Sequence, residues 1–278
     1  MIPFDFQYYA PESIEEAVDL YTTLDQEDRN PLYYGGGTEI ISFGRQSKIS
    51  TGAVIDLKNI PESVAWQPGK DTLKVGAALS LSFLTEQEQF PLLAGVARPV
   101  ADRTVRNRLT LGGNICGRLP YREALLPFLL GDARAVLAGP EGSRTVELMQ
   151  LFNKRMLLEK GEFLVQLLVP NAALQAAWWH KRREKHGPVD YPLVHLALMR
   201  LNGLLTAAVS GLCAFPFREA ALEDLLNDSS LTNSEKVEKS LSLLPGKVRD
   251  DDLASAAYRE RLWRIDLEQA LEEMEGVR

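Results

Sequence analysis

Cysteine is scarce in this chain. Its 278 residues include two cysteines, Cys116 and Cys213, which lie far apart in the sequence. An iron–sulfur cluster usually needs four thiolates, and a structural zinc site needs ligands at paired spacing, so we expect this chain to build neither by itself. Nothing marks the chain as secreted, and a disulfide is therefore not expected.

Positive charge and long apolar runs are also lacking. The formal net charge is −7, whereas binding to phosphate backbones needs a basic face, so we expect no nucleic-acid partner. No run of about 18 apolar residues is present, so no membrane-spanning helix is expected. The first residues lack the basic segment and apolar run of a secretory signal. The resulting expectation is a cytoplasmic protein with reduced thiols.

Hydrophobic periodicity predicts short helices and strands before residue 172. Ser13 and Glu16 have the spacing of a capping box, and apolar residues follow at helical spacing, so a helix is expected from there to the residue before Asn30. Shorter apolar segments predict the other elements. Strands are expected at 32–34, 53–57, 73–77, 133–138 and 163–169, and helices at 79–85, 91–102 and 123–130.

The pattern of predicted helices and strands changes near residue 172. Asn202-Gly203 suits the two left-handed positions of a type I′ turn. It separates apolar runs at 193–201 and 204–212, so an antiparallel hairpin is expected. Residues 251–273 carry apolar side chains at helical spacing. These patterns predict an α+β protein with a larger domain at 1–171, and with a smaller antiparallel sheet and helices at 172–278.

Two glycine-rich segments lie in the larger domain. Gly35-Gly36-Gly37 follows the apolar segment 32–34, and Gly112-Gly113 lies within 106–114. Glycine has no Cβ, so its backbone N–H groups approach a ligand closely, and such amides bind diphosphate oxygens. Either segment taken alone also suits a tight turn. Neither has GxGxxG or GxxxxGK[ST] spacing, so a standard nicotinamide dehydrogenase or nucleoside triphosphatase is not supported.

The order of motifs along the chain resembles the FAD-binding subunit of molybdopterin dehydrogenases, of the xanthine dehydrogenase and carbon monoxide dehydrogenase type. GGGTEI at 35–40 is similar to the AGGT[DE]L loop of that family, and RNRLTLGGN at 106–114 is similar to its IRNxGTIGGN loop. This colinearity is more specific than any one motif. Five further segments match in the same order: VIDLKNIP at 54–61, VGAA at 75–78, GEFL at 161–164, DYPLV at 190–194 and YRERL at 258–262.

The resemblance implies a two-lobed, PCMH-type FAD-binding domain, with lobes at about 1–57 and 58–171, followed by a flavoprotein C-terminal domain at 172–278. It also implies two partners, a large subunit that binds molybdopterin and a small subunit that holds [2Fe–2S] clusters. Electrons would pass from molybdenum through the clusters to FAD, and from FAD to NAD or another acceptor. The scarcity of cysteine fits that division of labour.

The same resemblance implies roles for individual residues. The two glycine loops would bind the FAD diphosphate from two sides. Glu123 falls where the family usually has an Asp that binds the adenosine ribose. Leu164 and Tyr191 match positions near the isoalloxazine ring, and Lys181 is a candidate basic group near the flavin. The residues expected around the diphosphate are Gly35, Gly36, Gly37, Thr38, Glu39, Thr110, Gly112, Gly113 and Asn114.

The segment after the second loop departs from the family pattern GGNxxxASPxxD. Leu119 replaces a small hydroxyl residue, which removes one expected hydrogen bond, and Glu123 is one methylene longer than Asp. Arg118 and Arg122 add positive charge near the expected phosphates, which compensates. These departures leave open a scaffold or assembly subunit that has kept the fold and lost the cofactor. A stand-alone flavin oxidase is a second alternative.

The histidines and one cysteine have both structural and functional interpretations. His195 lies in an apolar, strand-like run and is expected to be a structural histidine with satisfied hydrogen bonds. His180 and His186 belong to the basic and aromatic cluster 178–186, which is either a solvated loop or a docking patch for an anionic acceptor or an acidic partner. Cys116, inside the second loop, is either a redox thiol near the flavin or a small packed residue.

Overall fold

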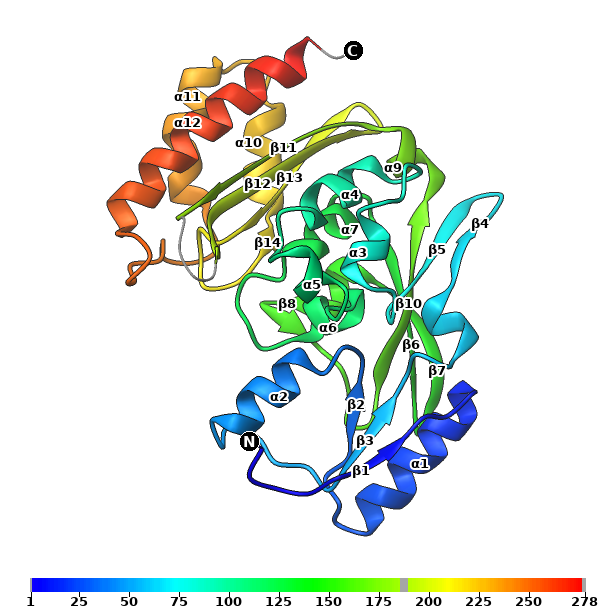
Figure 1. Cartoon of the computed structure of the whole chain (residues 1–278). Coiled ribbons are helices and arrows are strands. Elements are labelled where there is room, and N and C mark those ends of the chain that lie inside the picture. Colours follow the sequence, from blue (N-terminus) through cyan, green and yellow to red (C-terminus); the bar gives the residue numbers. More distant parts are fainter. Residues whose placement is uncertain (1, 186–189, 277–278) are drawn as a thin grey trace. The chain divides into compact units, whose positions relative to one another are not determined.

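The computed structural model describes residues 2–185 and 190–276, which form two compact units (Figure 1). The chain passes between the units five times, so each unit consists of three segments. The second unit thus includes two segments that precede residue 172, and the expected boundary there stays a prediction. The first unit comprises Met1–Leu84, Arg103–Arg118 and Ala133–Val169; the second comprises Thr85–Asp102, Leu119–Asp132 and Pro170–Arg278.

A small parallel sheet opens the first unit, with strand order β1-β3-β2. The first helix begins as expected at the cap Ser13, whose hydroxyl accepts from the backbone N–H of Glu16 at 3.1 Å. The Glu16 carboxylate accepts from the N–H of Glu12 instead of Ser13. Helix α2 was not predicted. The elements are β1 (Gln7–Tyr9), α1 (Ile14–Gln26), β2 (Leu32–Tyr34), α2 (Thr38–Arg45) and β3 (Ala53–Asp56).

A five-stranded sheet completes the first unit, with strand order β4-β5-β10-β6-β7. Its core is apolar: side chains of α1 and β3 pack with those of β6 and β10. The strands are β4 (Trp66–Pro68), β5 (Thr72–Gly76), β6 (Arg134–Gly139), β7 (Gly142–Glu147) and β10 (Phe163–Pro170). Short elements join them: η1 (Pro61–Val64), α3 (Leu81–Leu84), α5 (Arg103–Arg106), α6 (Leu111–Cys116), α8 (Leu148–Leu151), β8 (Phe152–Asn153) and β9 (Arg155–Met156).

The second unit is built on an antiparallel sheet with strand order β11-β12-β13-β14. The expected hairpin joins β12 to β13, and Asn202 and Gly203 both have positive φ, 52° and 82°, as the type I′ turn requires. The strands are β11 (Ala177–Glu184), β12 (Pro192–Leu201), β13 (Leu204–Ser210) and β14 (Phe217–Arg218).

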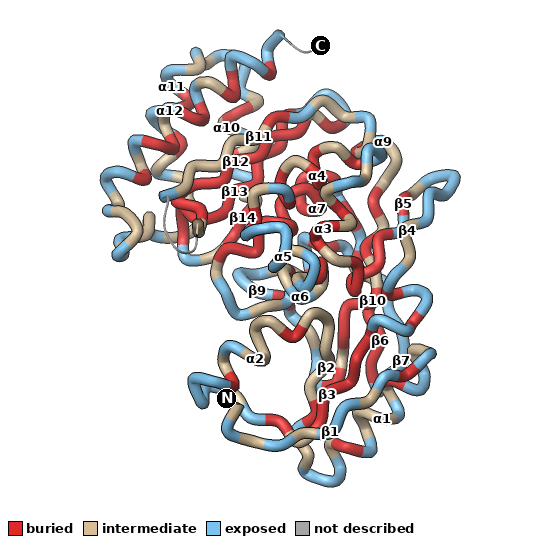
Figure 2. Tube along the Cα trace, viewed as in Figure 1, coloured by how far each residue is buried: buried red, intermediate tan, exposed pale blue. Residues whose placement is uncertain are grey.

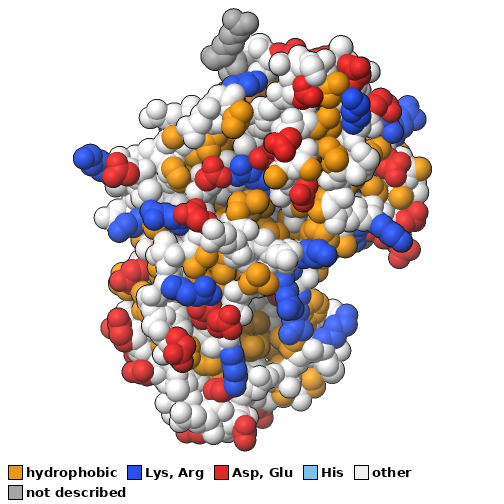
Figure 3. Space-filling view, turned by 180° about the vertical axis from the view of Figure 1, so that it is seen from behind, with side chains coloured by type: hydrophobic (Ala, Val, Ile, Leu, Met, Phe, Trp, Pro, Cys, Tyr) orange, Lys and Arg blue, Asp and Glu red, His pale blue; other side chains and the backbone are white. Residues whose placement is uncertain are grey.

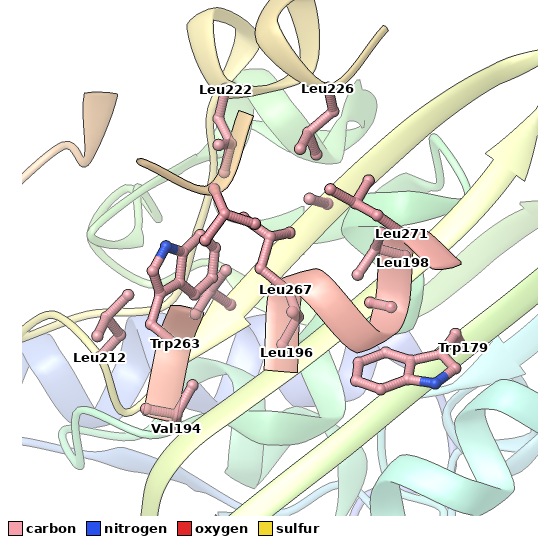
Figure 4. Close-up of a cluster of buried hydrophobic side chains, with 14 of the residues drawn as sticks. Trp179, Val194, Leu196, Leu198, Leu212, Leu222, Leu226, Trp263, Leu267 and Leu271 are labelled. Atoms are coloured by element: carbon pink, nitrogen blue, oxygen red, sulfur yellow. The ribbon is translucent and has the colours of Figure 1, made fainter. Parts of the chain in front are cut away.

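Helices cover both faces of this sheet, so almost every residue of β12 is buried (Figure 2). On one side, Trp263 and Leu267 of α12 pack on Leu196 of β12 and Leu222 of α10 (Figure 4). On the other side lie α4 and α7. The helices are α4 (Pro91–Ala97), η2 (Glu123–Leu125), α7 (Leu126–Leu130), α9 (Asn171–Gln175), α10 (Ala220–Asn227), α11 (Asn233–Ser240), η3 (Leu241–Leu243) and α12 (Ala256–Glu275).

The observed elements form the expected α+β fold, with parallel and antiparallel pairing. Some expectations were wrong in detail. The helix expected at 91–102 ends at Ala97. Residues 178–184 lie in strand β11, so the solvated-loop interpretation of the cluster 178–186 was wrong, whereas the docking-patch interpretation stays a prediction. Every helix among residues 2–185 and 190–276 is too short or too polar to cross a bilayer. Acidic and basic side chains lie interspersed on the face shown in Figure 3.

Candidate cofactor site

The first glycine loop connects β2 to α2. Gly37 is the N-cap of α2 and has a left-handed φ of 69°, which favours glycine. A Cβ on Gly37 would also overlap the ring of Tyr34. No side-chain hydrogen bond caps α2, so no side-chain oxygen of a capping residue meets the partial positive charge at its N-terminus. Such an end favours an anion.

The two glycine loops touch each other. A Cβ on Gly36 would overlap the carbonyl oxygen of Arg108, and a Cβ on Gly35 would overlap the hydroxyl of Thr110. The first two glycines are therefore needed for contact between the loops. This requirement differs from the one expected from the sequence, which was close approach to a ligand.

Thr110 and its neighbours hold the second loop in place. The Thr110 hydroxyl caps α6 by accepting from the N–H of Gly113 at 3.1 Å. The N–H of Gly112 donates to the carbonyl of Ala77 at 2.7 Å, and Asn114 continues the helix by donating its N–H to Thr110. The N–H groups of Gly112 and Gly113 thus already have acceptors within the protein. This loop can therefore contact a ligand through its surface but not through these two N–H groups.

The two loops enclose one cavity of about 170 Å³. Glu39 of α2 joins them, because both its carboxylate oxygens accept from the backbone N–H of Arg118 at 2.8 Å. Five of the twelve lining residues are glycine, whose bare backbone suits close approach by a compact anion such as a diphosphate. Sequence reasoning placed Cys116 inside the second loop but did not include Tyr33 or Gly117. The cavity is lined by Tyr33, Gly35, Gly36, Gly37, Thr38, Glu39, Ile40, Leu109, Thr110, Gly113, Cys116 and Gly117.

The structure thus brings seven of the nine expected diphosphate residues to one cavity, whereas Gly112 and Asn114 lie in α6 and are not among its lining residues. Leu164 belongs to the same compact unit. It is a buried residue of β10, paired with Leu137 of β6. Glu123, Lys181 and Tyr191 belong to the second unit.

Glu123 is the anchor of a buried polar cluster in the second unit. Its Oε1 accepts from Nε of Arg182 at 2.7 Å and lies 2.7 Å from Nδ1 of His195. Burial raises the pKa of this carboxyl, but hydrogen bonding to His195 and the charges of His195 and Arg182 outweigh burial and hold the pKa below its usual value. The expected contact between Glu123 and the adenosine ribose stays a prediction. The carboxylate already has two partners within the protein, Arg182 and His195.

Two histidines extend the cluster. Nε2 of His195 lies 3.3 Å from Nδ1 of His180. The two ring nitrogens share one hydrogen bond, in which the donor is set by the tautomers of the two histidines. Burial, together with the charge of His195, lowers the pKa of His180 to about 4. His195 is fully buried and hydrogen-bonded, as expected for a structural histidine; His186 lies outside the described residues.

Lys181 and Tyr191 have separate surroundings. Lys181 donates from Nζ to the side chain of Gln269 at 3.1 Å. The Tyr191 ring stacks on Tyr121 with a centroid separation of 4.5 Å. A second cavity in this unit, about 860 Å³, was not anticipated. It lies beside α4 and is lined in part by Arg98, His180 and Arg182.

Comparisons with known proteins agree with one another. A family model described as "FAD binding domain in molybdopterin dehydrogenase" matches residues 4–172. The carbon monoxide dehydrogenase medium chain of Hydrogenophaga pseudoflava is 33% identical over 194 residues, which cover 67% of each chain. The glyceraldehyde dehydrogenase medium chain of Sulfolobus acidocaldarius is 25% identical over 287 residues, covering 99% of this chain and 100% of the relative.

A solved structure has the same fold. Carbon monoxide dehydrogenase from Hydrogenophaga pseudoflava, in a form that lacks the Mo-pyranopterin moiety of the molybdenum cofactor, matches with a TM-score of 0.86 and 26% identity. The match covers 98% of this chain and 98% of that chain, so the likeness extends over both compact units.

Proposed function

Because this chain belongs to the family of FAD-binding domains in molybdopterin dehydrogenase, we propose that it is the flavin subunit of a heteromeric molybdenum hydroxylase. The observation that carries the proposal is the cavity closed by two glycine loops, with the uncapped start of α2 at its wall. Bound FAD supplies the redox chemistry, by taking up and releasing electrons.

The chain's own residues would bind and orient the cofactor. Gly36, Gly37 and Thr38 lie at the start of α2, where backbone dipoles stabilise a diphosphate. Since the N–H groups of Gly112 and Gly113 already have protein acceptors, we assign the phosphate hydrogen bonds to the first loop. Roles for Leu164, Lys181 and Tyr191 near the flavin ring, and for Glu123 near the ribose, are part of this proposal.

The partners we propose are a molybdopterin-binding large subunit and a small subunit with [2Fe–2S] clusters. The similar proteins are themselves subunits, which supports this proposal. Two of them are dehydrogenase medium chains, and a third is the nicotinate dehydrogenase FAD-subunit of Eubacterium barkeri. Electrons would enter FAD from the clusters and leave to NAD or another acceptor. Residues 2–185 and 190–276 contain no group of three or more His, Cys, Asp or Glu side chains that could hold a metal ion.

Two observations favour a cofactor-free scaffold as the second candidate. Leu119, which stands in place of the family's hydroxyl residue, is 42% exposed, and the carboxylate of Glu123 is paired inside the second unit. A scaffold of this kind would purify without flavin and would not take up FAD on reconstitution.

Flavin content tests the proposal. We expect the purified 278-residue chain to bind FAD at about one molecule per chain after reconstitution. Gly113→Val should abolish this uptake and leave the circular dichroism spectrum unchanged, because Gly113 is exposed at the cavity and a Cβ there would meet one atom, Oγ1 of Thr110, at 2.9 Å. Gly246→Ala is the control, since its Cβ would come no nearer than 3.4 Å to Phe215. Normal flavin content in the Gly113 variant contradicts the assignment.

A further inference from the structure

Lys58, two residues beyond β3, holds the first glycine loop from outside the cavity. Its Nζ donates to the carbonyl oxygen of Gly35 at 2.8 Å and to Oδ2 of Asp56 at 2.5 Å. Lys58 is not among the residues that line the cavity. A charged donor bonded to a single loop carbonyl fixes the direction of that peptide more firmly than a neutral donor does.

The lysine itself is fixed by a buried carboxylate. The side chain of Asp56 is 4% exposed, and its Oδ1 accepts from the backbone N–H of Lys58 at 3.0 Å. The hydroxyl of Tyr8 donates to Oδ2 of the same carboxylate at 2.6 Å. This hydrogen bond raises the pKa of Tyr8 to about 12, so the phenol remains a donor at neutral pH. Strands β1 and β3 thus supply the support for Lys58.

The lysine also contacts the far end of the loop indirectly. Nζ lies 4.8 Å from the ring centroid of Tyr34, a cation–π distance. The Tyr34 ring fills the space beside Gly37 that a side chain there would need. Lys58 therefore bonds Gly35 directly and contacts the Tyr34 ring that lies beside Gly37.

Peptide geometry connects this restraint to the cavity. In a trans peptide the carbonyl and the following N–H point in opposite directions. The carbonyl of Gly35 points to Lys58, outside the cavity, so the N–H of Gly36 is turned away from Lys58. Gly36 lines the cavity, and its N–H is then set to donate to an anion bound there.

We propose that Lys58, held by Asp56 and Tyr8, is a positioning residue that orients the first glycine loop to receive the diphosphate of FAD. The inference rests on the proposed function of the cavity. Preorganising the loop strengthens binding because less order has to be imposed when the ligand arrives.

The first test is the affinity for FAD of lysine variants of the whole chain. We expect Lys58→Met to weaken FAD binding about 10- to 100-fold, the effect of losing a charged hydrogen bond. Lys58→Arg should restore part of the affinity, because a guanidinium can bond the same carbonyl. The control is Lys74→Met, an exposed lysine of β5 in the same unit, which should bind FAD as the wild type does. Equal affinity in the Met variants at 58 and 74 overturns the proposal.

Asp56→Asn separates positioning from direct attraction between Lys58 and phosphate. If Lys58 acted only through its charge, removing a neighbouring negative charge would maintain or increase FAD affinity. If Lys58 positions the loop, the loss of its anchor weakens binding. Tyr8→Phe should weaken binding by a smaller factor in a fully folded protein, since Tyr8 is 58% exposed. An absorbance spectrum of FAD-saturated variants equal to that of the wild type would exclude a change around the isoalloxazine ring as the cause.

Hydrogen exchange without FAD distinguishes failure of this proposal from failure of the proposed function. In the FAD-free chain, Lys58→Met should accelerate exchange of the 34–40 amides and leave those of α1 unchanged. If the wild type binds no FAD but shows this difference, the proposed function is wrong and the restraint of the loop stands. If exchange at 34–40 is the same in both proteins, Lys58 does not order the loop.

Discussion

At the scale of single residues, the glycines of the site serve two different purposes. Gly35 and Gly36 allow one loop to lie on the other, and Gly37 provides a left-handed helix start. Gly113 is exposed at the cavity, where a side chain would reduce the room for a ligand. The sequence showed both glycine groups but could not separate these purposes, since both require the same missing Cβ.

Gly36→Ala should therefore damage structure as well as binding. Its Cβ would overlap the carbonyl oxygen of Arg108, which is backbone and cannot rotate away. We expect a loss of about 1–3 kcal/mol in the free energy of unfolding, typical of overpacking, together with loss of FAD binding. Urea denaturation followed by flavin titration measures both, with Gly246→Ala as the reference. Unchanged stability would show that the loops separate easily.

His180 should make the second unit sensitive to acid. The pKa of His180 is lowered to about 4, against about 6.5 in an unfolded chain. The unfolded chain therefore binds a proton before the folded one, so this contribution to stability is present above pH 6.5 and lost as the pH falls towards 4. Between pH 7 and pH 5 it amounts to on the order of 2 kcal/mol.

His180→Gln should make the loss of stability between pH 7 and pH 5 smaller than in the wild type. Gln offers His195 both an N–H donor and a carbonyl acceptor, and it does not titrate in this range. Groups facing His180, including His195, Glu123 and Arg182, remain in both proteins. Denaturant titrations at the two pH values give the comparison, and an equal loss in both proteins would exclude His180 as the source.

At the scale of helices and strands, the elements that begin or end at a recognisable cap or turn sequence were predictable. The cap of α1 and the Asn202-Gly203 turn depend on residues adjacent in sequence. Strand β11 has no such signal, because its basic residues are neutralised by partners far along the chain: Arg182 pairs with Glu123, and Arg183 pairs with Asp266. Read alone, the same basic run resembles a solvated loop. Helix α2 was missed because its start is a glycine with no side-chain cap.

Arg259 ties α12 to the sheet. It is fully buried, donates to the carbonyls of Leu193 and Gly211 at 2.8 and 3.0 Å, and pairs with Asp251 at 2.6 Å. Arg259→Met should cost about 3–5 kcal/mol, since two buried carbonyls lose a charged donor and the Asp251 carboxylate loses one of its two arginine partners. Arg261→Met, an exposed position on the same helix, should change stability by no more than about 0.5 kcal/mol. Chemical denaturation of both variants measures the two changes in the free energy of unfolding. Equal losses in the two variants would refute the role of Arg259.

At the scale of the whole molecule, the two units are interleaved along the chain. Helices α4 and α7 precede residue 172, yet they contact the sheet formed by β11, β12 and β13. Fold class was readable from the sequence because it depends on local patterns. The partners of α4 and α7 were not, since a buried helix face does not indicate which sheet covers it.

A fragment of residues 1–171 should therefore fail to fold as a soluble unit. It would lack the strands β11–β13 that α4 and α7 contact, and both helices consist mainly of residues that are buried in the whole chain. We expect aggregation or strong binding of a hydrophobic dye by the fragment, whereas the 278-residue chain binds little. A monomeric fragment with a cooperative melting transition would instead support an independent domain ending near 171.

Interleaving also bears on how such a protein can change over time. The C-terminal segment from β11 to α12 is only part of the second unit, so it cannot be exchanged between proteins as an independent domain. A transplanted β11–α12 segment would lack α4 and α7, the two helices that contact its sheet. Recombination at the gene level should thus be tolerated at the outer loops of either unit and rejected at the five crossings between them.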